Sequence, residues 1–223
     1  MKSIQSHHSF VHFESKGYES LNALLKNKQY SKLFVLVDTN THEHCLSVFL
    51  EQLERVAIEI IEIEAGEEHK HLDTCMGVWE ALSELGADRK SLLMNLGGGV
   101  VTDLGGFVAC TFKRGIDYVN IPTTLLSMVD ASVGGKTGVD LGNLKNQIGV
   151  ISEPQMVLVD PNYLSTLPDE EVRSGYAEML KHGLIADLNY WKTLKDYKSI
   201  HSGELLPLIH RSIEIKNKVV TED

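Results

Sequence analysis

The sequence predicts an α/β protein with a Rossmann-like parallel sheet, followed by the beginning of an all-α domain. Strand-like apolar segments alternate with segments of helical periodicity as far as about residue 161. One of these strands is followed by a glycine triplet and then a helix, and the last part of the chain has two long helical patterns without a strand between them. We therefore expect an α/β domain at residues 1–161 and a truncated helical domain at residues 162–223.

The first elements alternate as this fold requires. Residues 10–14 suit a short strand, and residues 18–28 carry leucines at helical spacing. The run LFVLV at residues 33–37 is apolar without interruption, which is typical of a parallel strand buried on both faces. Helix-like sequence extends to about residue 54, and a β-branched strand at residues 57–63 and a helix at residues 71–85 follow.

The third strand–helix unit contains the triplet, between a strand at residues 91–96 and a helix at residues 100–112 that ends at residues 112–114. A strand at residues 118–121 is stopped by Pro122, and Thr123 and Thr124 open another helix. After a last strand at residues 156–159, we expect helices at residues 168–187 and 204–220. This alternation predicts a parallel sheet with helices on both faces.

Composition and charge exclude several classes of protein. With 43% hydrophobic and 23% charged residues, the chain of 223 residues is typical of a globular protein. A net charge of -10 argues against a nucleic-acid partner, so an anionic substrate needs a local group of cations. No apolar run suits a signal peptide or a membrane span, and the three cysteines form no C-x-x-C pair. We expect a cytoplasmic protein with reduced thiols and no membrane partner.

The triplet of Gly97, Gly98 and Gly99 predicts a site for a phosphate or pyrophosphate. Glycine allows positive φ and close approach of an anion, while the helix N-terminus supplies unpaired N–H groups. Neither G-x-G-x-x-G nor G-x-x-x-x-G-K-[ST] occurs in the sequence, so the usual dinucleotide and P-loop fingerprints are absent. An ordinary tight turn explains the triplet as well.

Polar residues follow the predicted strands where an open α/β sheet holds its ligands: Asp38 and Asn40, then Glu67 and Lys70, then Asp103. Helix caps or turns also explain the aspartates and the asparagine, and solvated charges explain the other two. A denser group, with Asp130, Gly134, Gly135, Lys136, Lys145 and Asn146, lies among apolar residues at 128–146. Charges buried there need partners, whereas a flexible loop is the alternative.

Glu178, Lys181 and His182 are spaced i, i+3 and i+4 on one face of a predicted helix. A carboxylate and an imidazole at this spacing suit zinc. An exposed i, i+4 pair has the same spacing. No H-E-x-x-H pattern supplies further ligands, so the sequence contains no complete metal site.

Five motifs resemble the 3-dehydroquinate synthases of the shikimate pathway. They are GGGVVTDLGGF at 97–107, FKRG at 112–115, IPTTLLSMVDASVGGKTGVDL at 121–141, KNQIG at 145–149 and GYAEMLKHGLI at 175–185. The resemblance covers nearly the whole chain and implies an NAD-binding α/β domain, a helical domain and an active site between them. It also implies a cytoplasmic homodimer, with no nucleic acid or membrane as partner.

The resemblance implies roles for individual residues. The NAD contacts correspond to Asp38, Asn40, Glu67, Lys70, Gly98, Gly99, Val100, Asp103, Thr123, Thr124, Leu126, Lys136, Lys145, Tyr163, Thr166 and Leu167. The catalytic and substrate-binding groups correspond to Arg114, Asp130, Lys136, Asn146 and Lys181. Glu178 corresponds to the carboxylate ligand of a divalent metal, zinc or cobalt, whereas His182 is not a ligand in the family pattern.

The reaction that the resemblance implies converts the sugar-phosphate acid 3-deoxy-D-arabino-heptulosonate 7-phosphate to 3-dehydroquinate and phosphate, a carbon–oxygen lyase step of chorismate and aromatic amino acid biosynthesis. NAD transiently oxidises the substrate, phosphate leaves, the hydride returns and an aldol closure forms the ring. The family continues for more than a hundred residues past Asp223, where its two zinc-binding histidines lie. We therefore expect that the chain is a fragment.

Three other functions stay open at this level. A metal- and NAD-dependent polyol or glycerol-phosphate dehydrogenase would accumulate NADH. A related sugar-phosphate cyclase would make an inosose or a valiolone. A chain that binds nucleotide without catalysis would bind NAD and release no phosphate.

Overall fold

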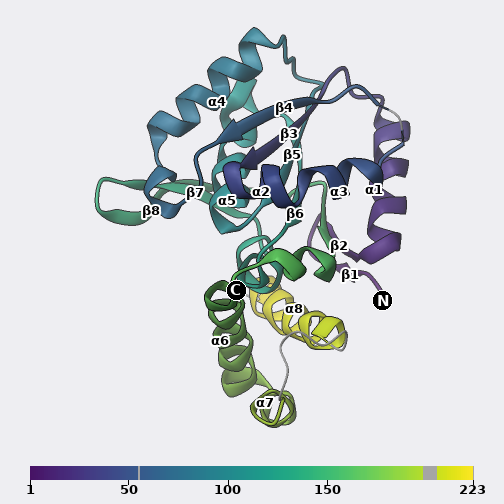
Figure 1. Cartoon of the computed structure of the whole chain (residues 1–223), viewed down its shortest axis with the longest axis vertical. Helices are drawn as coiled ribbons and strands as arrows, with labels where there is room; N and C mark the ends of the chain where they lie inside the picture. The colour runs from purple at the N-terminus through teal and green to yellow at the C-terminus, as the bar shows by residue number, and fades with distance from the viewer. Residues whose placement is uncertain (55, 198–204, 223) are drawn as a thin grey trace.

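The computed structural model describes residues 1–54, 56–197 and 205–222 and contains a seven-stranded sheet (Figure 1). The strand order is β1-β2-β9-β6-β5-β3-β4, and all neighbours run parallel except β1 and β2. The strands are β1 (Ile4–Gln5), β2 (Phe10–Phe13), β3 (Leu33–Asp38), β4 (Glu59–Ile63), β5 (Leu92–Gly97), β6 (Asp117–Pro122) and β9 (Met156–Val159). The predicted parallel sheet is confirmed.

The central strands are buried on both faces. β3 is buried from Leu33 to Val37 and β5 along its whole length, because helices cover the sheet on both sides. Side chains of α1 (Glu14–Lys28) and α3 (Leu46–Glu51) pack in one apolar cluster, and those of α4 (Leu72–Glu84) and α5 (Gly99–Thr111) pack in the other. The sheet therefore separates two cores, as an uninterrupted apolar strand predicts.

Two helices depart from the sequence prediction. α1 starts at Glu14 instead of residue 18, and so takes in the residue expected to end the first strand. The helix expected to run to residue 54 is divided into α2 (Thr39–His44) and α3 at Cys45, whose φ of -119° departs from the helical value. Single-sequence periodicity does not locate such boundaries, which depend on the packing of each turn.

The stretch at residues 128–146 takes part in regular structure. A π-helix, η3 (Ser127–Ala131), precedes an antiparallel hairpin of β7 (Lys136–Leu141) and β8 (Leu144–Ile151). The hairpin packs on α5 so closely that a Cβ on Gly106 would lie 2.5 Å from Thr137 Cγ2. The flexible-loop alternative is therefore wrong, and the sequence did not predict the hairpin.

A layer of three helices follows the 3₁₀ turn η4 (Pro161–Thr166): α6 (Asp169–Ala186), α7 (Leu188–Lys195) and α8 (Leu205–Glu222). The helices predicted at residues 168–187 and 204–220 are confirmed within a few residues, although Glu204 lies outside the described residues, and α7 was not predicted. Met179 of α6 and Ile209 of α8 share a buried cluster with Val119 of β6. The division at residue 162 stays a prediction. No helix in the described part of the chain is both long and apolar enough to cross a bilayer.

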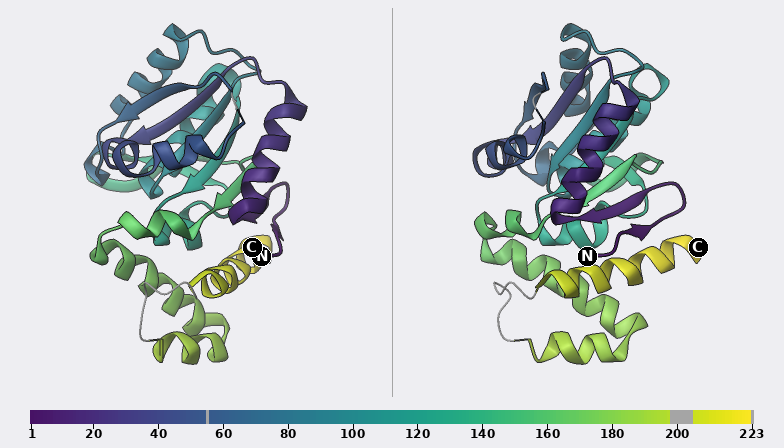
Figure 2. Two further views of the ribbon diagram at one scale, coloured as in Figure 1. Left: turned by 45° about the vertical axis from the view of Figure 1, so that its right-hand side comes forward. Right: turned by 90° about the vertical axis from the view of Figure 1, so that its right-hand side faces the viewer.

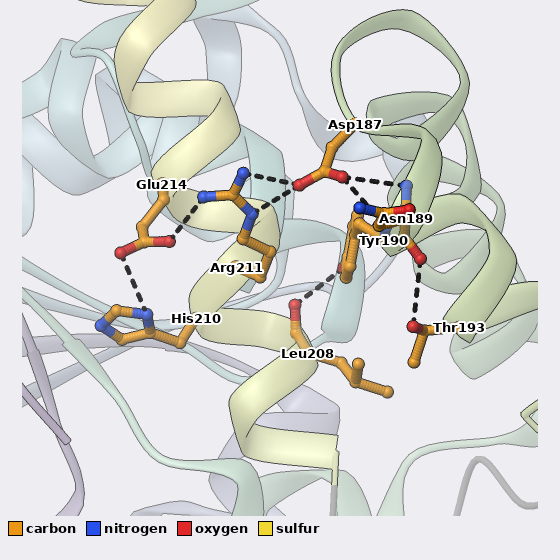
Figure 3. Close-up of polar contacts among 8 residues, drawn as sticks. All are labelled: Asp187, Asn189, Tyr190, Thr193, Leu208, His210, Arg211 and Glu214. Carbon is orange, nitrogen blue, oxygen red and sulfur yellow. Dashed lines mark hydrogen bonds and ion pairs between the residues drawn. The ribbon is translucent and has the colours of Figure 1, made fainter.

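A polar cluster holds α8 against the corner between α6 and α7 (Figure 3). Asp187 Oδ1 accepts hydrogen bonds from the backbone N–H groups of Asn189 and Tyr190, at 3.1 and 3.0 Å, and caps α7. Its other oxygen accepts from Arg211 of α8, at 2.9 Å from Nε and 2.6 Å from Nη2. Tyr190 donates through its hydroxyl to the carbonyl of Leu208 at 2.7 Å. These bonds set the position of α8 relative to α6.

The N-terminal segment lies beside α8 (Figure 2). Asn217 of α8 donates a hydrogen bond to the carbonyl of Gln5 at 2.9 Å. The N-terminal strand β2 pairs in parallel with β9, with Val11 opposite Val157. The N-terminal segment therefore contacts both the sheet, through β9, and the helical layer, through α8.

Candidate active site

Most of the predicted site residues lie at one edge of the sheet, where the parallel strands end. β3 ends at Asp38, β5 at Gly97 and β6 at Pro122, and the last two residues are paired. Open α/β sheets hold their ligands at this carboxyl edge. The position of the site along the sheet is thus the expected one.

The glycine turn opens α5, with Gly98 as its N-cap. None of the three glycines takes a positive φ, so the conformational reason for glycine is wrong here. Close packing requires glycine instead: a Cβ on Gly97 would lie 2.5 Å from Val101 Cβ, and one on Gly98 would lie 2.9 Å from Thr124 Cγ2. The N–H groups that follow have no helical acceptor, and such groups bind phosphate oxygens.

Asp38 and Asn40 start α2. Asp38 Oδ1 accepts from Thr41 N at 2.8 Å, and the backbone N–H of Asp38 donates to Thr41 Oγ1 at 2.9 Å, which completes a capping box. Asn40 is exposed in the first turn. The capping explanation is therefore confirmed for Asp38. A cofactor contact by either residue stays a prediction.

Lys70 joins the loop after β4 to α5 and the hairpin. Its side chain is 4% exposed, and its Nζ lies 2.7 Å from both Asp103 Oδ2 and Asn146 Oδ1. Burial raises the pKa of Asp103 to about 6, although Lys70 opposes the rise. Lys70 is therefore not a solvated charge. Glu67, in η1 (Glu67–His69), is more exposed and pairs with Lys145 at 3.0 Å.

The remaining predicted cofactor contacts follow β6 and β9. Thr123 is buried, and Thr124 and Leu126 are half-buried between β6 and the π-helix. Tyr163 of η4 is buried, and its hydroxyl lies 2.9 Å from that of Tyr18, which donates to Asp160 at 3.0 Å. In the same segment, Leu167 is half-buried and Thr166 exposed. These residues share the carboxyl edge with the glycine turn.

A cavity of about 460 Å³ lies between α5, the π-helix, the hairpin and α8. It is lined by the predicted residues Asp103, Asp130, Lys136 and Asn146, together with Ala131, Val133, Thr137, Gly138, Gln147, Gly149, Val150, Ile151 and Lys216. Lys216 was not among the sequence candidates. Its Nζ lies 2.5 Å from Asp130 Oδ1. A lysine on an amphipathic helix carries no signal of this contact, which depends on how α8 packs.

Asp130, Glu178 and His182 form a second cluster beside this cavity, with one ligand atom of each within 4.8 Å of the others. Glu178 and His182 lie one turn apart on α6, with His182 Nε2 3.2 Å from Glu178 Oε1. Burial lowers the pKa of His182, which favours the neutral imidazole that binds metals. Ser212 Oγ of α8 lies 2.7 Å from His182 Nδ1 and fixes the ring.

This cluster has the donors of a metal site. Asp130 Oδ1 and Glu178 Oε1 are shielded from solvent, and neither has a hydrogen bond of acceptable geometry among the described residues. Their charged neighbours are the ammonium groups of Lys216 and Lys181. Two carboxylates and an imidazole suit zinc. The sequence indicated Glu178 as a ligand. The spacing of Glu178 and His182 in the sequence indicated that they share a helix face, but the sequence did not predict that Asp130 lies beside them.

Two predicted substrate-binding residues lie outside the cavity lining. Lys181 is 56% exposed on α6, where its Nζ contacts Glu178. Arg114 is exposed in η2 (Phe112–Arg114), at the opposite end of α5 from Gly98. The 13 residues of α5 extend over about 20 Å. The described chain therefore does not bring Arg114 to the cavity, and its role stays a prediction.

The chain matches known sequences along most of its length. A family model described as 3-dehydroquinate synthase N-terminal matches residues 60–174, and one described as 3-dehydroquinate synthase C-terminal matches residues 175–223. The 3-dehydroquinate synthase of Parabacteroides distasonis is 43% identical over 205 residues, covering 91% of this chain and 58% of the relative. That of Rhodopirellula baltica is 46% identical over 179 residues, covering 77% and 48%. The chain spans about half the length of the curated relatives it matches.

Solved structures share the fold. A 2-deoxy-scyllo-inosose synthase complexed with carbaglucose-6-phosphate, NAD+ and Co2+ has a TM-score of 0.88 at 26% identity, covering 99% of this chain and 64% of that one. ValA, a 2-epi-5-epi-valiolone synthase from Streptomyces hygroscopicus with NAD+ and Zn2+ bound, has a TM-score of 0.81 at 29% identity, covering 98% and 62%. An iron-containing alcohol dehydrogenase from Thermotoga maritima, with a TM-score of 0.70 at 15% identity and coverage of 99% and 69%, shares the fold alone.

Proposed function

Because the chain belongs to the 3-dehydroquinate synthase family, we propose that it takes part in the conversion of 3-deoxy-D-arabino-heptulosonate 7-phosphate to 3-dehydroquinate and phosphate. The observation that carries the proposal is the cavity in which Asp130, Lys136 and Asn146 meet. Identity favours this substrate, since it is 43% to a 3-dehydroquinate synthase but 29% or less to the two other cyclases compared.

The cavity contains two cations that can bind a sugar-phosphate acid, beside the carboxylates of Asp103 and Asp130. Lys136 and Lys216 line it, in a chain whose net charge is -10. Ammonium groups form strong charge-assisted hydrogen bonds to phosphate and carboxylate oxygens. The amide of Asn146 suits the substrate hydroxyls, and the carboxylate of Asp130 orients the lysine beside it.

NAD is the cofactor that this site suits. When bound, it supplies a hydride acceptor that is regenerated within each turnover. The backbone N–H groups after Gly98 would bind its pyrophosphate, and Asp103 is placed to accept from a ribose hydroxyl. The NAD+ in the two structural relatives solved with it supports this assignment.

The cluster of Asp130, Glu178 and His182 would hold a divalent metal, zinc or cobalt. A metal bound there supplies a Lewis acid that lowers the pKa of a substrate hydroxyl. The protein's own part is to keep the two carboxylates apart from solvent and the imidazole neutral. We also propose the division at residues 1–161 and 162–223, assembly as a homodimer and location in the cytoplasm.

The test is a turnover assay on the chain with NAD, zinc and the heptulosonate phosphate, in which phosphate and NADH are both measured. The proposal expects phosphate release that exceeds the amount of enzyme, with no net NADH. Net NADH would indicate a dehydrogenase. NAD binding without phosphate release, under conditions where a full-length relative turns over, would indicate a nucleotide-binding chain and would contradict the proposal.

A further inference from the structure

Lys70, Asp140 and Asn146 are joined by a closed ring of three hydrogen bonds. The backbone N–H of Asp140 donates to the carbonyl of Lys70 at 2.9 Å. The backbone N–H of Asn146 donates to Asp140 Oδ1 at 2.7 Å. The ammonium of Lys70 donates to Asn146 Oδ1 at 2.7 Å and closes the ring. The ring ties the β7–β8 hairpin to the loop after β4.

The ring fixes an unusual backbone conformation. Asn146 has a φ of 53°, in the left-handed region that few residues other than glycine adopt. Val139 pairs with Ile148 and Leu141 with Leu144, so Lys145, Asn146 and Gln147 lie opposite the single residue Asp140. Such a bulge leaves backbone groups of β8 without ladder partners and re-aims a side chain. The carboxylate of Asp140 accepts from the N–H that the bulge exposes.

The ring also lies between the two halves of the site. Lys70 is 4% exposed and donates to Asp103 Oδ2 at 2.7 Å as well as to Asn146. Both Asp103, near the start of α5, and Asn146 line the cavity, where Asp103 is the proposed cofactor contact and Asn146 the proposed substrate contact. A shift of Asn146 would therefore take a hydrogen bond from Lys70 and leave a buried ammonium with one partner fewer.

We propose that Asp140 is a positioning residue that holds Asn146 in its left-handed conformation. Through the hydrogen bonds of Lys70 to Asn146 and Asp103, it also fixes the position of the substrate contact relative to the cofactor contact. The identity of the two ligands rests on the proposed function, whereas the ring itself does not. Asp140 itself contacts neither the sugar phosphate nor NAD. Its action is on the backbone N–H of Asn146.

The test compares Asp140→Ala with Asp140→Asn, because an asparagine keeps the oxygen that accepts from Asn146 N–H. Hydrogen exchange of the Asn146 amide reports on the ring without any ligand. We expect exchange about 10-fold faster in Asp140→Ala and within about 2-fold of the wild type in Asp140→Asn. In turnover, KM for the sugar phosphate should rise about 10-fold in the alanine variant with kcat nearly unchanged, since ground-state positioning is lost.

Leu144→Ala is the matched control, since it removes a 61% exposed side chain from the same hairpin. It should leave both readouts unchanged. Equal effects of Leu144→Ala and Asp140→Ala, or no rescue by Asp140→Asn, would overturn the proposal, and so would unchanged Asn146 exchange in Asp140→Ala. If the wild type shows no turnover, the proposed function fails, while the exchange measurements still decide whether Asp140 sets Asn146.

Discussion

The glycine turn and the cavity lie at the same edge of the sheet but are built in different ways. Gly97 ends β5, and Gly98 packs on Thr124, which follows the adjacent strand β6, so the turn is built from neighbouring strands and the first turn of α5. The cavity brings Asp130 of the π-helix to Lys216 of α8, and the neighbouring cluster adds Glu178 of α6. The shape of the turn is set by close packing of the backbone, whereas the shape of the cavity depends on how the helical layer packs on the sheet.

The largest effect should separate the two regions by function. Lys136→Ala removes a cation from the cavity and should lower turnover about 100- to 1,000-fold. Its NAD affinity should fall much less, because Lys136 is only one of the many NAD contacts that the resemblance implies. Gly98→Val should lower the affinity for NAD directly, since its side chain would meet Thr124 and cover the N–H groups of the turn. Isothermal titration with NAD and a phosphate-release assay check both. Parallel loss of NAD affinity and turnover in Lys136→Ala would count against the separation.

The contact between the helical layer and the sheet can be broken at Gly175 of α6. A Cβ there would lie 2.5 Å from the backbone N of Leu126 and 2.6 Å from Leu125 Cβ. Backbone cannot yield as a side chain does, so Gly175→Ala should lower the free energy of unfolding by about 2 to 3 kcal/mol in urea titrations. Gly77→Ala is the control, since a Cβ there meets nothing within 4 Å in α4. It should stabilise by up to about 1 kcal/mol.

Asp103 links the two regions, and its pKa gives a dependence on pH. Burial raises that pKa from its ordinary value of 3.8 to about 6. Between about pH 4 and pH 6 the unfolded chain releases this proton while the folded protein keeps it, so stability falls as the pH rises. The difference in free energy of unfolding between the wild type and Asp103→Asn should therefore fall by about 2 kcal/mol across this window. A difference that rises with pH would refute the assignment.

The smallest effect concerns the support of His182. Ser212→Ala removes a buried hydrogen bond to His182 Nδ1 and should cost about 1 kcal/mol of stability. Because the imidazole then loses its fixed orientation, cobalt affinity should fall about 10-fold. Ser83→Ala, which removes an exposed serine on α4, should change neither quantity measurably. An unchanged cobalt affinity in Ser212→Ala would show that the serine does not position the ring.

The sequence predicted what depends on local patterns. The run at residues 33–37 is a buried central strand because neighbours on both sides require apolar faces. Glu178 and His182 share a helix face because their spacing places them there. The triplet stands before a helix as expected, but packing against Val101 and Thr124, not positive φ, is what requires glycine.

Contacts between distant segments could not be predicted in this way. Lys216 reaches Asp130 because α8 is held in place by its apolar face and by the polar cluster around Asp187. The hairpin was missed because its glycines and charges resemble a loop, while the pairing of Gly138 with Gly149 is visible only once the strands are built. The burial of Lys70 likewise depends on Asp103 and Asn146, which lie far from it in sequence.

The pairing of β2 with β9 has a consequence for synthesis and folding. At about 5 to 20 residues per second, β9 leaves the ribosome roughly 7 to 30 s after β2. During that interval β2 has no parallel neighbour, because the long chain segment between β2 and β9 must first bring the two strands together. α8, which contacts Gln5, is later still. We expect the N-terminal strand, although it is made first, to be among the last elements to become protected from hydrogen exchange.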